Sequence, residues 1–137
     1  MTDILGDRIP ACPEPTVETV AYWQAADSHR LMIGRCRACG EAHFYPRARC
    51  PRCLSDDTVL EQAEGAGKVY SYSVMRRAKV PYAIAYVTLK EGPTMMTNII
   101  GCAADDIRIG MPVSVVFVDT DGAHKAPMFK PAGNDAR

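Results

Sequence analysis

Two pairs of cysteines with the same spacing constrain this chain more than any other feature. Cys36 and Cys39 stand in the run CRAC, and Cys50 and Cys53 stand in the run CPRC. Each pair offers two thiolates on a tight turn, and four thiolates complete the tetrahedral shell of a structural Zn²⁺ ion at about 2.3 Å per bond. The spacing therefore predicts a zinc ribbon that these four cysteines close, with no position left open for a substrate or a catalytic water.

Other interpretations of the cysteines stay open. Thiolates also bind iron, so a rubredoxin-like iron site is an alternative at the same spacing. His43 lies between the two pairs and is a substitute ligand, although with four cysteines present we expect it to be a strand residue. Cys12 and Cys102 stand alone, and we expect each to be a small apolar residue rather than a nucleophile. The sequence shows no signal-peptide pattern at its start, so we expect reduced thiols and no disulfides.

The charges balance over the chain but not around the cysteines. Lys plus Arg and Asp plus Glu each number 16, so the formal net charge is zero, which argues against a general polyanion binder. Residues 30–53, by contrast, hold six arginines and a single acidic residue, Glu41. Four thiolates with Zn²⁺ add two negative charges, so the segment keeps about three positive charges. These arginines either offset the thiolates or bind an anion, and the sequence leaves both roles open.

The rest of the chain indicates a short helix followed by a β region. Residues 1–15 contain three prolines and resemble an extended leader, and Thr16 is placed to cap a helix that runs to about Asp27, with Val17, Val20, Ala21 and Trp23 on its apolar side. Alternating apolar residues and Gly- or Pro-containing turns then predict five short strands, at 68–77, 83–89, 95–100, 113–118 and near 128–129. Five short strands without helical crossovers favour a small closed barrel such as an OB-fold.

The sequence offers few signs of catalysis or of membrane insertion. We find no GxSxG or HExxH motif and no Ser/His/Asp constellation with recognisable spacing. No apolar run approaches the roughly 18 residues that a membrane span requires. A second basic group, Arg76, Arg77 and Lys79, follows the first barrel strand and is either an anion site or a solvated loop.

Several runs, taken in order, carry a family resemblance. They are PTVETVAYWQAA, GRCRACGEAHFYPRARCPRC, GAGKVYSYSVM, AIAYVTLKEGPTMMTNIIG, IRIGMPVSVVF and APMFKP. Over residues 14–131 the chain resembles the DUF35 family, OB-fold acyl-CoA-associated proteins with a rubredoxin-like zinc ribbon. Many zinc ribbons share the two CxxC turns, whereas their combination with the later runs is far more specific.

The resemblance implies both a fold and a role. The implied fold is mainly β: a leader and helix over 1–30, a rubredoxin-like zinc ribbon over 31–60, an OB-fold barrel over 61–131 and a tail over 132–137. The implied role is a non-catalytic, cytoplasmic subunit of a hetero-oligomer with a thiolase-superfamily enzyme, with CoA or an acyl-CoA as a ligand. A nucleic-acid-binding ribbon and OB module is the alternative.

Coenzyme A carries phosphates, which arginine and lysine hold by charge-assisted hydrogen bonds. The basic residues beside the second cysteine pair and after the first barrel strand are therefore the expected anion contacts for the CoA phosphates. These residues are Arg47, Arg49, Arg76, Arg77 and Lys79.

Overall fold

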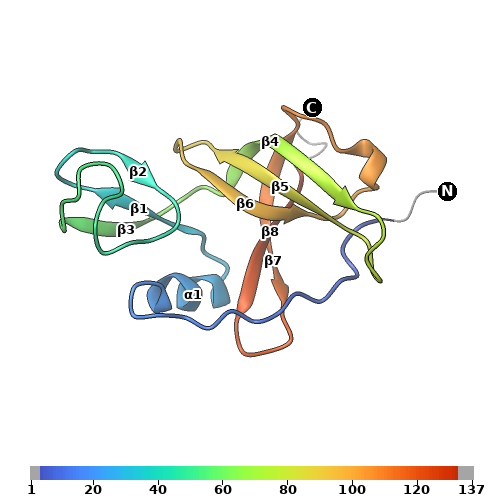
Figure 1. Cartoon of the computed structure of the whole chain (residues 1–137), viewed down its shortest axis with the longest axis horizontal. Helices are drawn as coiled ribbons and strands as arrows, with labels where there is room; N and C mark the ends of the chain where they lie inside the picture. The colour runs from blue at the N-terminus through green and yellow to red at the C-terminus, as the bar shows by residue number, and fades with distance from the viewer. Residues whose placement is uncertain (1–3, 133–137) are drawn as a thin grey trace.

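The computed structural model describes residues 4–132 as a small β sheet, a β-barrel and one helix (Figure 1). The elements in chain order are α1 (Val20–Asp27), β1 (Met32–Cys36), β2 (Ala42–His43), β3 (Thr58–Gln62), β4 (Ala66–Met75), β5 (Tyr82–Leu89), β6 (Thr94–Ile99), the 3-10 helix η1 (Ala104–Asp106), β7 (Pro112–Asp119) and β8 (Lys125–Pro131). No helix among these residues is long and apolar enough to cross a membrane. The mainly β fold expected from the sequence is confirmed.

A three-stranded antiparallel sheet carries the cysteines. Its strand order is β2-β1-β3, so the central strand β1 is paired on both sides. Gly34 of β1 lies opposite His43 of β2 and Leu60 of β3. β3 is not among the predicted strands. It forms because β1, which leads into the first cysteine turn, offers a free edge to the segment that leaves the second turn.

The five remaining strands close into a barrel in the order β4-β5-β6-β8-β7. The β6–β8 pair is parallel, and the other pairs, including β4–β7, are antiparallel. Each strand lies near its predicted position, and β8 is longer than the short strand expected near 128–129. On β5, Ala83, Ala85, Val87 and Leu89 are buried while the alternate residues face outward. That alternation matches the period of two for a strand with one face on a core.

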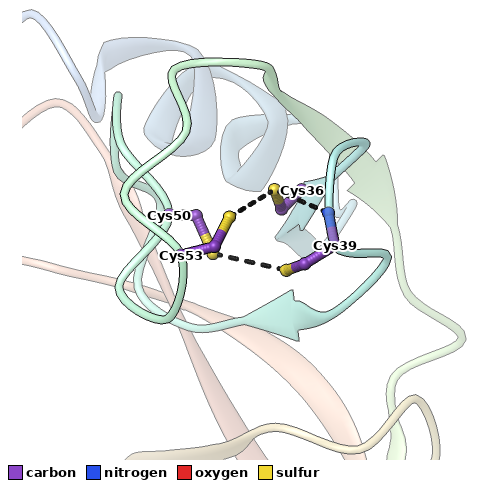
Figure 2. Close-up of side chains that lie close together, drawn as sticks. All are labelled: Cys36, Cys39, Cys50 and Cys53. Carbon is purple, nitrogen blue, oxygen red and sulfur yellow. Dashed lines mark hydrogen bonds between the residues drawn. The ribbon is translucent and has the colours of Figure 1, made fainter.

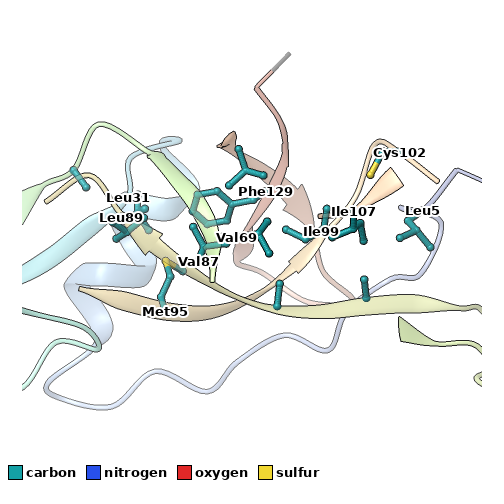
Figure 3. Close-up of a cluster of buried hydrophobic side chains, with 14 of the residues drawn as sticks. Leu5, Leu31, Val69, Val87, Leu89, Met95, Ile99, Cys102, Ile107 and Phe129 are labelled. Atoms are coloured by element: carbon teal, nitrogen blue, oxygen red, sulfur yellow. The ribbon is translucent and has the colours of Figure 1, made fainter. Parts of the chain in front are cut away.

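The barrel interior is filled by aliphatic side chains around Phe129, which is fully buried on β8 (Figure 3). Val69, Val87 and Ile99 pack in the same cluster from β4, β5 and β6. Leu31, just before β1, also belongs to it, so the ribbon and the barrel share one continuous core.

Helix α1 begins three residues later than the sequence predicts, with Thr19 in place of Thr16 as the capping residue. The hydroxyls of Thr16 and Thr19 lie 3.1 Å apart, and the amide of Thr16 donates to the Thr19 Oγ1 at 2.9 Å. The Thr16 hydroxyl is therefore bonded to Thr19 and does not cap the helix. The predicted apolar side is also wrong, because Val17 is 96% exposed whereas Tyr22, Ala25 and Ala26 are buried. Their spacing of three and four residues defines the buried face.

The leader crosses the barrel and is tied down at two points. The amide of Leu5 donates to the carbonyl of Cys102 at 2.8 Å, and the amide of Gly101 donates back to Leu5 at 2.9 Å. Further along, the amide of Cys12 donates to the Asp121 carboxylate at 2.8 Å, at the tip of the β7–β8 hairpin. The leader is thus held against the barrel between Leu5 and Cys12.

Candidate functional site

The four predicted cysteines form one cluster (Figure 2). Their sulfur atoms all lie within 4.8 Å of one another. The sulfurs of Cys36 and Cys53 are 3.6 Å apart, and those of Cys39 and Cys50 are 3.7 Å apart. A tetrahedral site with bonds of about 2.3 Å has edges of about 3.8 Å, so the cluster fits a Zn²⁺ ion. The four sulfurs occupy every position of such a shell, which gives the ion a structural role.

The backbone of each cysteine turn points amide hydrogens at a buried sulfur. The amide of Cys39 donates to the sulfur of Cys36 at 3.4 Å, and the amide of Arg52 donates to the sulfur of Cys50 at 3.3 Å. Gly40 closes the first turn at a φ of +81°, a conformation that glycine adopts without a Cβ penalty. In each turn a backbone amide thus holds the buried sulfur in place.

Backbone amides favour the thiolate form, which binds metal, at two of the four cysteines. The backbone N–H of Cys39 holds the pKa of Cys36 below its usual value. The backbone N–H of Cys53 lowers the pKa of Cys50 to about 7. Both sulfurs belong to buried residues, whereas Cys39 and Cys53 are exposed. One sulfur of each turn thus faces the interior, and the other lies at the surface.

His43 lies outside the sulfur cluster. It ends β2, as predicted, and is only 7% exposed. Neither ring nitrogen has a hydrogen-bond partner, and burial, with a smaller contribution from Arg47, lowers the pKa of the ring. The ring rests on Gly34 of β1, where any side chain would collide with it. His43 therefore packs the ribbon interior as a neutral ring.

The two remaining cysteines also lie apart from the cluster. Cys102 is buried in the core, where burial and then the neighbouring Asp106 raise the pKa of its thiol. Cys12 is half-buried in the leader against Gly122 of the β7–β8 hairpin. Cys102 thus occupies the environment of a small apolar residue, as the sequence suggests.

Two of the ribbon arginines hold the ribbon together. The guanidinium of Arg35 donates two hydrogen bonds of 3.0 Å to Glu61 on β3 and one of 2.9 Å to the carbonyl of Gly40. Arg37 pairs with Asp57 at 2.7 Å. These acidic partners follow the second cysteine turn, outside the arginine-rich segment 30–53. Much of the expected positive charge is therefore neutralised across the β1–β3 pair.

The predicted CoA contacts fall into two groups at opposite ends of the molecule (Figure 1). Arg47 and Arg49 are exposed on the ribbon, and Arg49 donates to the carbonyl of Leu54 at 2.9 Å. Arg76, Arg77 and Lys79 are exposed in the turn between β4 and β5. Within that group, Arg76 pairs with the exposed Asp105 at 3.3 Å. The structure brings together the members of each group but does not bring the two groups together.

A groove of about 460 Å³ is a feature that the sequence does not predict. The leader, α1, the residues after β2 and the strands β5, β6 and β8 contribute to its walls. The indole nitrogen of Trp23 donates to the hydroxyl of Tyr45 at 2.6 Å on one wall. The only sequence signal is a spread of aromatic and methionine residues, which a core would show equally well.

Comparison with known protein families accounts for both parts of the fold. Residues 23–59 match the family model described as the ChsH2 rubredoxin-like zinc ribbon domain, and residues 60–118 match the model described as the ChsH2 C-terminal OB-fold domain. A DUF35 domain-containing scaffold protein of Methanocaldococcus jannaschii is 37% identical over 106 residues, which cover 72% of this chain and 75% of that protein. The chain belongs to the DUF35 family.

Other relatives place the same domain in larger assemblies. A protein of Thermomonospora curvata named a probable enoyl-CoA hydratase alpha subunit is 39% identical over 127 residues, and the match covers 88% of this chain but only 40% of that protein. A solved structure titled Ltp2-ChsH2(DUF35) aldolase matches with a TM-score of 0.79 and 37% identity, over 89% of this chain and 100% of the matched chain. Scaffold proteins and subunits of CoA enzymes or an aldolase are thus among the proteins that this DUF35 chain resembles.

Proposed function

We propose that this chain is a non-catalytic subunit that binds and supports a thiolase-superfamily enzyme and helps to hold CoA thioesters for it. The observation that carries the proposal is the likeness to the Ltp2-ChsH2(DUF35) aldolase, because the match spans the whole of the compared chain at 37% identity. The family relatives named scaffold proteins support the same role.

The zinc site suits a scaffold. We propose that Cys36, Cys39, Cys50 and Cys53 are the zinc ligands. A small sheet such as β2-β1-β3 has little core of its own, and a metal supplies the folding free energy that such a ribbon lacks. Fixing the ribbon also fixes the Arg47 side of the molecule relative to the barrel, since Leu31 joins both cores.

The barrel surface carries side chains that suit a protein interface. Tyr70, Tyr72 and Tyr86 are 67%, 39% and 46% exposed, and Met96 is 61% exposed. Tyrosine and methionine are enriched at protein interfaces relative to other surfaces. Tyr86 lies directly opposite Met96 on neighbouring strands, so these two form a contiguous apolar area on the outside of the barrel.

The subunit proposal is tested by affinity purification of the tagged chain from its native host, followed by mass spectrometry. We expect a thiolase-superfamily protein in near-stoichiometric amount. A Tyr86→Asp, Met96→Asp double variant should lose that protein, whereas a Glu14→Lys control, altered on the exposed leader, should retain it. Recovery of nucleic acid or of the chain alone would refute the proposal, and nucleic acid would favour the binding-module alternative.

The CoA part of the proposal has its own test. Titration of acetyl-CoA into the purified partner complex should give saturable binding that weakens when Arg47 and Arg49, or Arg76, Arg77 and Lys79, are changed to glutamate. Arg108→Glu reverses one exposed arginine elsewhere on the surface and is the control for a charge reversal outside both basic groups. Equal affinity in all variants would show that neither basic group contacts the phosphates.

A further inference from the structure

The groove between the leader and the barrel is largely apolar, and three of its polar side chains are paired within the fold. The hydroxyl of Thr97 donates to the carbonyl of Pro127 at 3.3 Å, and the Nδ2 of Asn98 donates to the carbonyl of Ala83 at 2.9 Å. The indole of Trp23 is satisfied by Tyr45. Most of the remaining lining is aromatic or aliphatic, and three methionines contribute to it. The walls therefore favour an apolar body.

In the part of the chain that the structure describes, one charged side chain lines the groove, and it is positive. The guanidinium of Arg8 lies over the ring of Tyr82, 4.1 Å from its centroid, which holds a cation at that place. Within residues 4–132, Arg8 forms no ion pair, and no acidic residue lines the groove. Among these residues, the charge at this position thus lacks a counter-charge.

Arg8 is held at one end of the groove. It shares a small adjoining cavity with Tyr82, Asn98 and Met128, so these four residues lie together. The backbone bonds of Leu5 and Cys12 secure the leader on either side of it. The other walls include Trp23 and Tyr45, brought in by α1 and by the chain after β2. The groove therefore has a cationic end and a long aromatic and aliphatic wall.

We propose that this groove binds an elongated apolar molecule with one anionic group, the anion at Arg8 and the apolar body along the wall that contains Trp23. The volume of about 460 Å³ lies within the usual range for small-molecule sites. A guanidinium forms charge-assisted hydrogen bonds with a carboxylate, and the apolar wall gains from removing hydrocarbon from water. The inference does not depend on a thiolase partner, although the groove needs the folded ribbon that supplies Tyr45.

Trp23 is the only tryptophan of the chain, so its fluorescence reports on the groove directly. The full-length zinc-loaded chain is titrated with decanoate, decanol and decyltrimethylammonium, each kept below its micelle concentration. We expect a saturable change of Trp23 emission with decanoate, and an affinity for decanol that is about tenfold lower because the charge-assisted bond is lost. The cationic analogue should bind more weakly than decanol.

Four variants separate the contribution of the Arg8 charge from that of the apolar cavity. Arg8→Gln should weaken decanoate about tenfold and leave decanol within about twofold. Arg8→Lys should keep most of the preference for decanoate, and Arg108→Gln, at an exposed arginine outside the groove, should behave like the unaltered chain. Ile84→Phe places a larger side chain on the groove wall and should weaken both ligands.

The titrations of the unaltered chain and the Arg8 variants have one outcome that supports the proposal and three that overturn it. Retained decanol binding in Arg8→Gln, together with lost preference for decanoate, supports the proposal and shows that the leader is still folded. The proposal is overturned if decanoate and decanol bind the unaltered chain equally, if Arg8→Gln keeps the preference, or if no ligand changes the emission of Trp23.

Discussion

Replacing Gly34 by alanine tests how the ribbon is packed. A Cβ built on Gly34 would lie 2.6 Å from both Cδ2 and Cε1 of His43, and nearer still to its Nε2. Carbon atoms in contact are normally about 3.5–4.0 Å apart, so the ring would have to move by about 1 Å. The ring has little room to do so because His43 is only 7% exposed. Forcing an extra methyl group into a close-packed interior costs about 1–3 kcal/mol.

The sign of this effect distinguishes crowding from strand propensity. Where a strand has space, replacing glycine by alanine stabilises a protein by about 0.4–1 kcal/mol through the unfolded chain. We expect the opposite at Gly34: a melting temperature lower by about 3–10 °C for a chain of this size. Because ribbon folding and zinc binding are coupled, the affinity for zinc should fall by about 5- to 150-fold.

Two measurements with matched controls check the reasoning. Zinc affinity is measured by competition with a chelator, and stability by thermal unfolding. Gly92→Ala is the control, because Gly92 has a φ of +118° and a methyl group placed there would have no atom within 4 Å. This control should lower stability through backbone strain without changing the affinity for zinc. In a His43→Ala background, Gly34→Ala should cost nothing. An unchanged zinc affinity in the single variant, or an equal cost with and without the His43 ring, would refute the argument.

Three further predictions follow from particular contacts. His43→Leu should match or exceed the stability of the unaltered chain at pH 7, since it removes two buried nitrogens without partners. Burial lowers the pKa of His43, so the unfolded chain takes up the proton at a higher pH than the folded chain, and stability falls as the pH drops through about 6.5. With zinc saturating, the melting temperature measured from pH 7.5 to 5.5 should therefore depend less steeply on pH in His43→Leu than in the unaltered chain. The Asp27 carboxylate accepts a hydrogen bond from the amide of Lys125 and pairs with Nδ1 of His124, each at 2.8 Å. In urea unfolding, Asp27→Ala should therefore destabilise the chain by about 1–2 kcal/mol, and Asp27→Asn by less. Equal losses in the two variants would contradict the role of the shared acceptor. The chain should contain one zinc and be colourless, and a chelator should expose the amides of β1 and β3 to hydrogen exchange while those of β5 stay protected; a red, iron-containing protein, or loss of protection everywhere at once, would contradict this prediction.

The cysteine cluster and the barrel were predictable because each depends on a short-range pattern. Two residues between paired cysteines suffice to place both sulfurs on one turn, and backbone amides then aim at those sulfurs whatever the neighbouring side chains are. The alternation of Ala83, Ala85, Val87 and Leu89 fixes which face of β5 is inside. Such features need no knowledge of distant residues.

β3 and the helix start were not predictable in the same way. The segment TVLEQ alternates poorly in burial and becomes a strand through pairing with β1 and the Arg35–Glu61 bond. At the helix, Thr16 has the side chain of a good cap, but a second threonine three residues later competes for its hydroxyl. In both cases the secondary structure depends on a partner residue or strand that the local sequence pattern does not reveal.

The groove shows the same principle at the level of function. Arg8 and Tyr82 are far apart in sequence, and neither stands in a motif. The leader nevertheless places one over the other because Leu5 bonds to Cys102 and Cys12 bonds to Asp121. An isolated arginine in a proline-containing leader carries no information about ligand binding until that path is known. The cysteine motif therefore identifies the part of the chain that the metal stabilises, while the residues proposed to select an anion are assembled only by the tertiary fold. Arg8→Gln separates the two parts, since it should alter ligand preference while leaving zinc affinity unchanged.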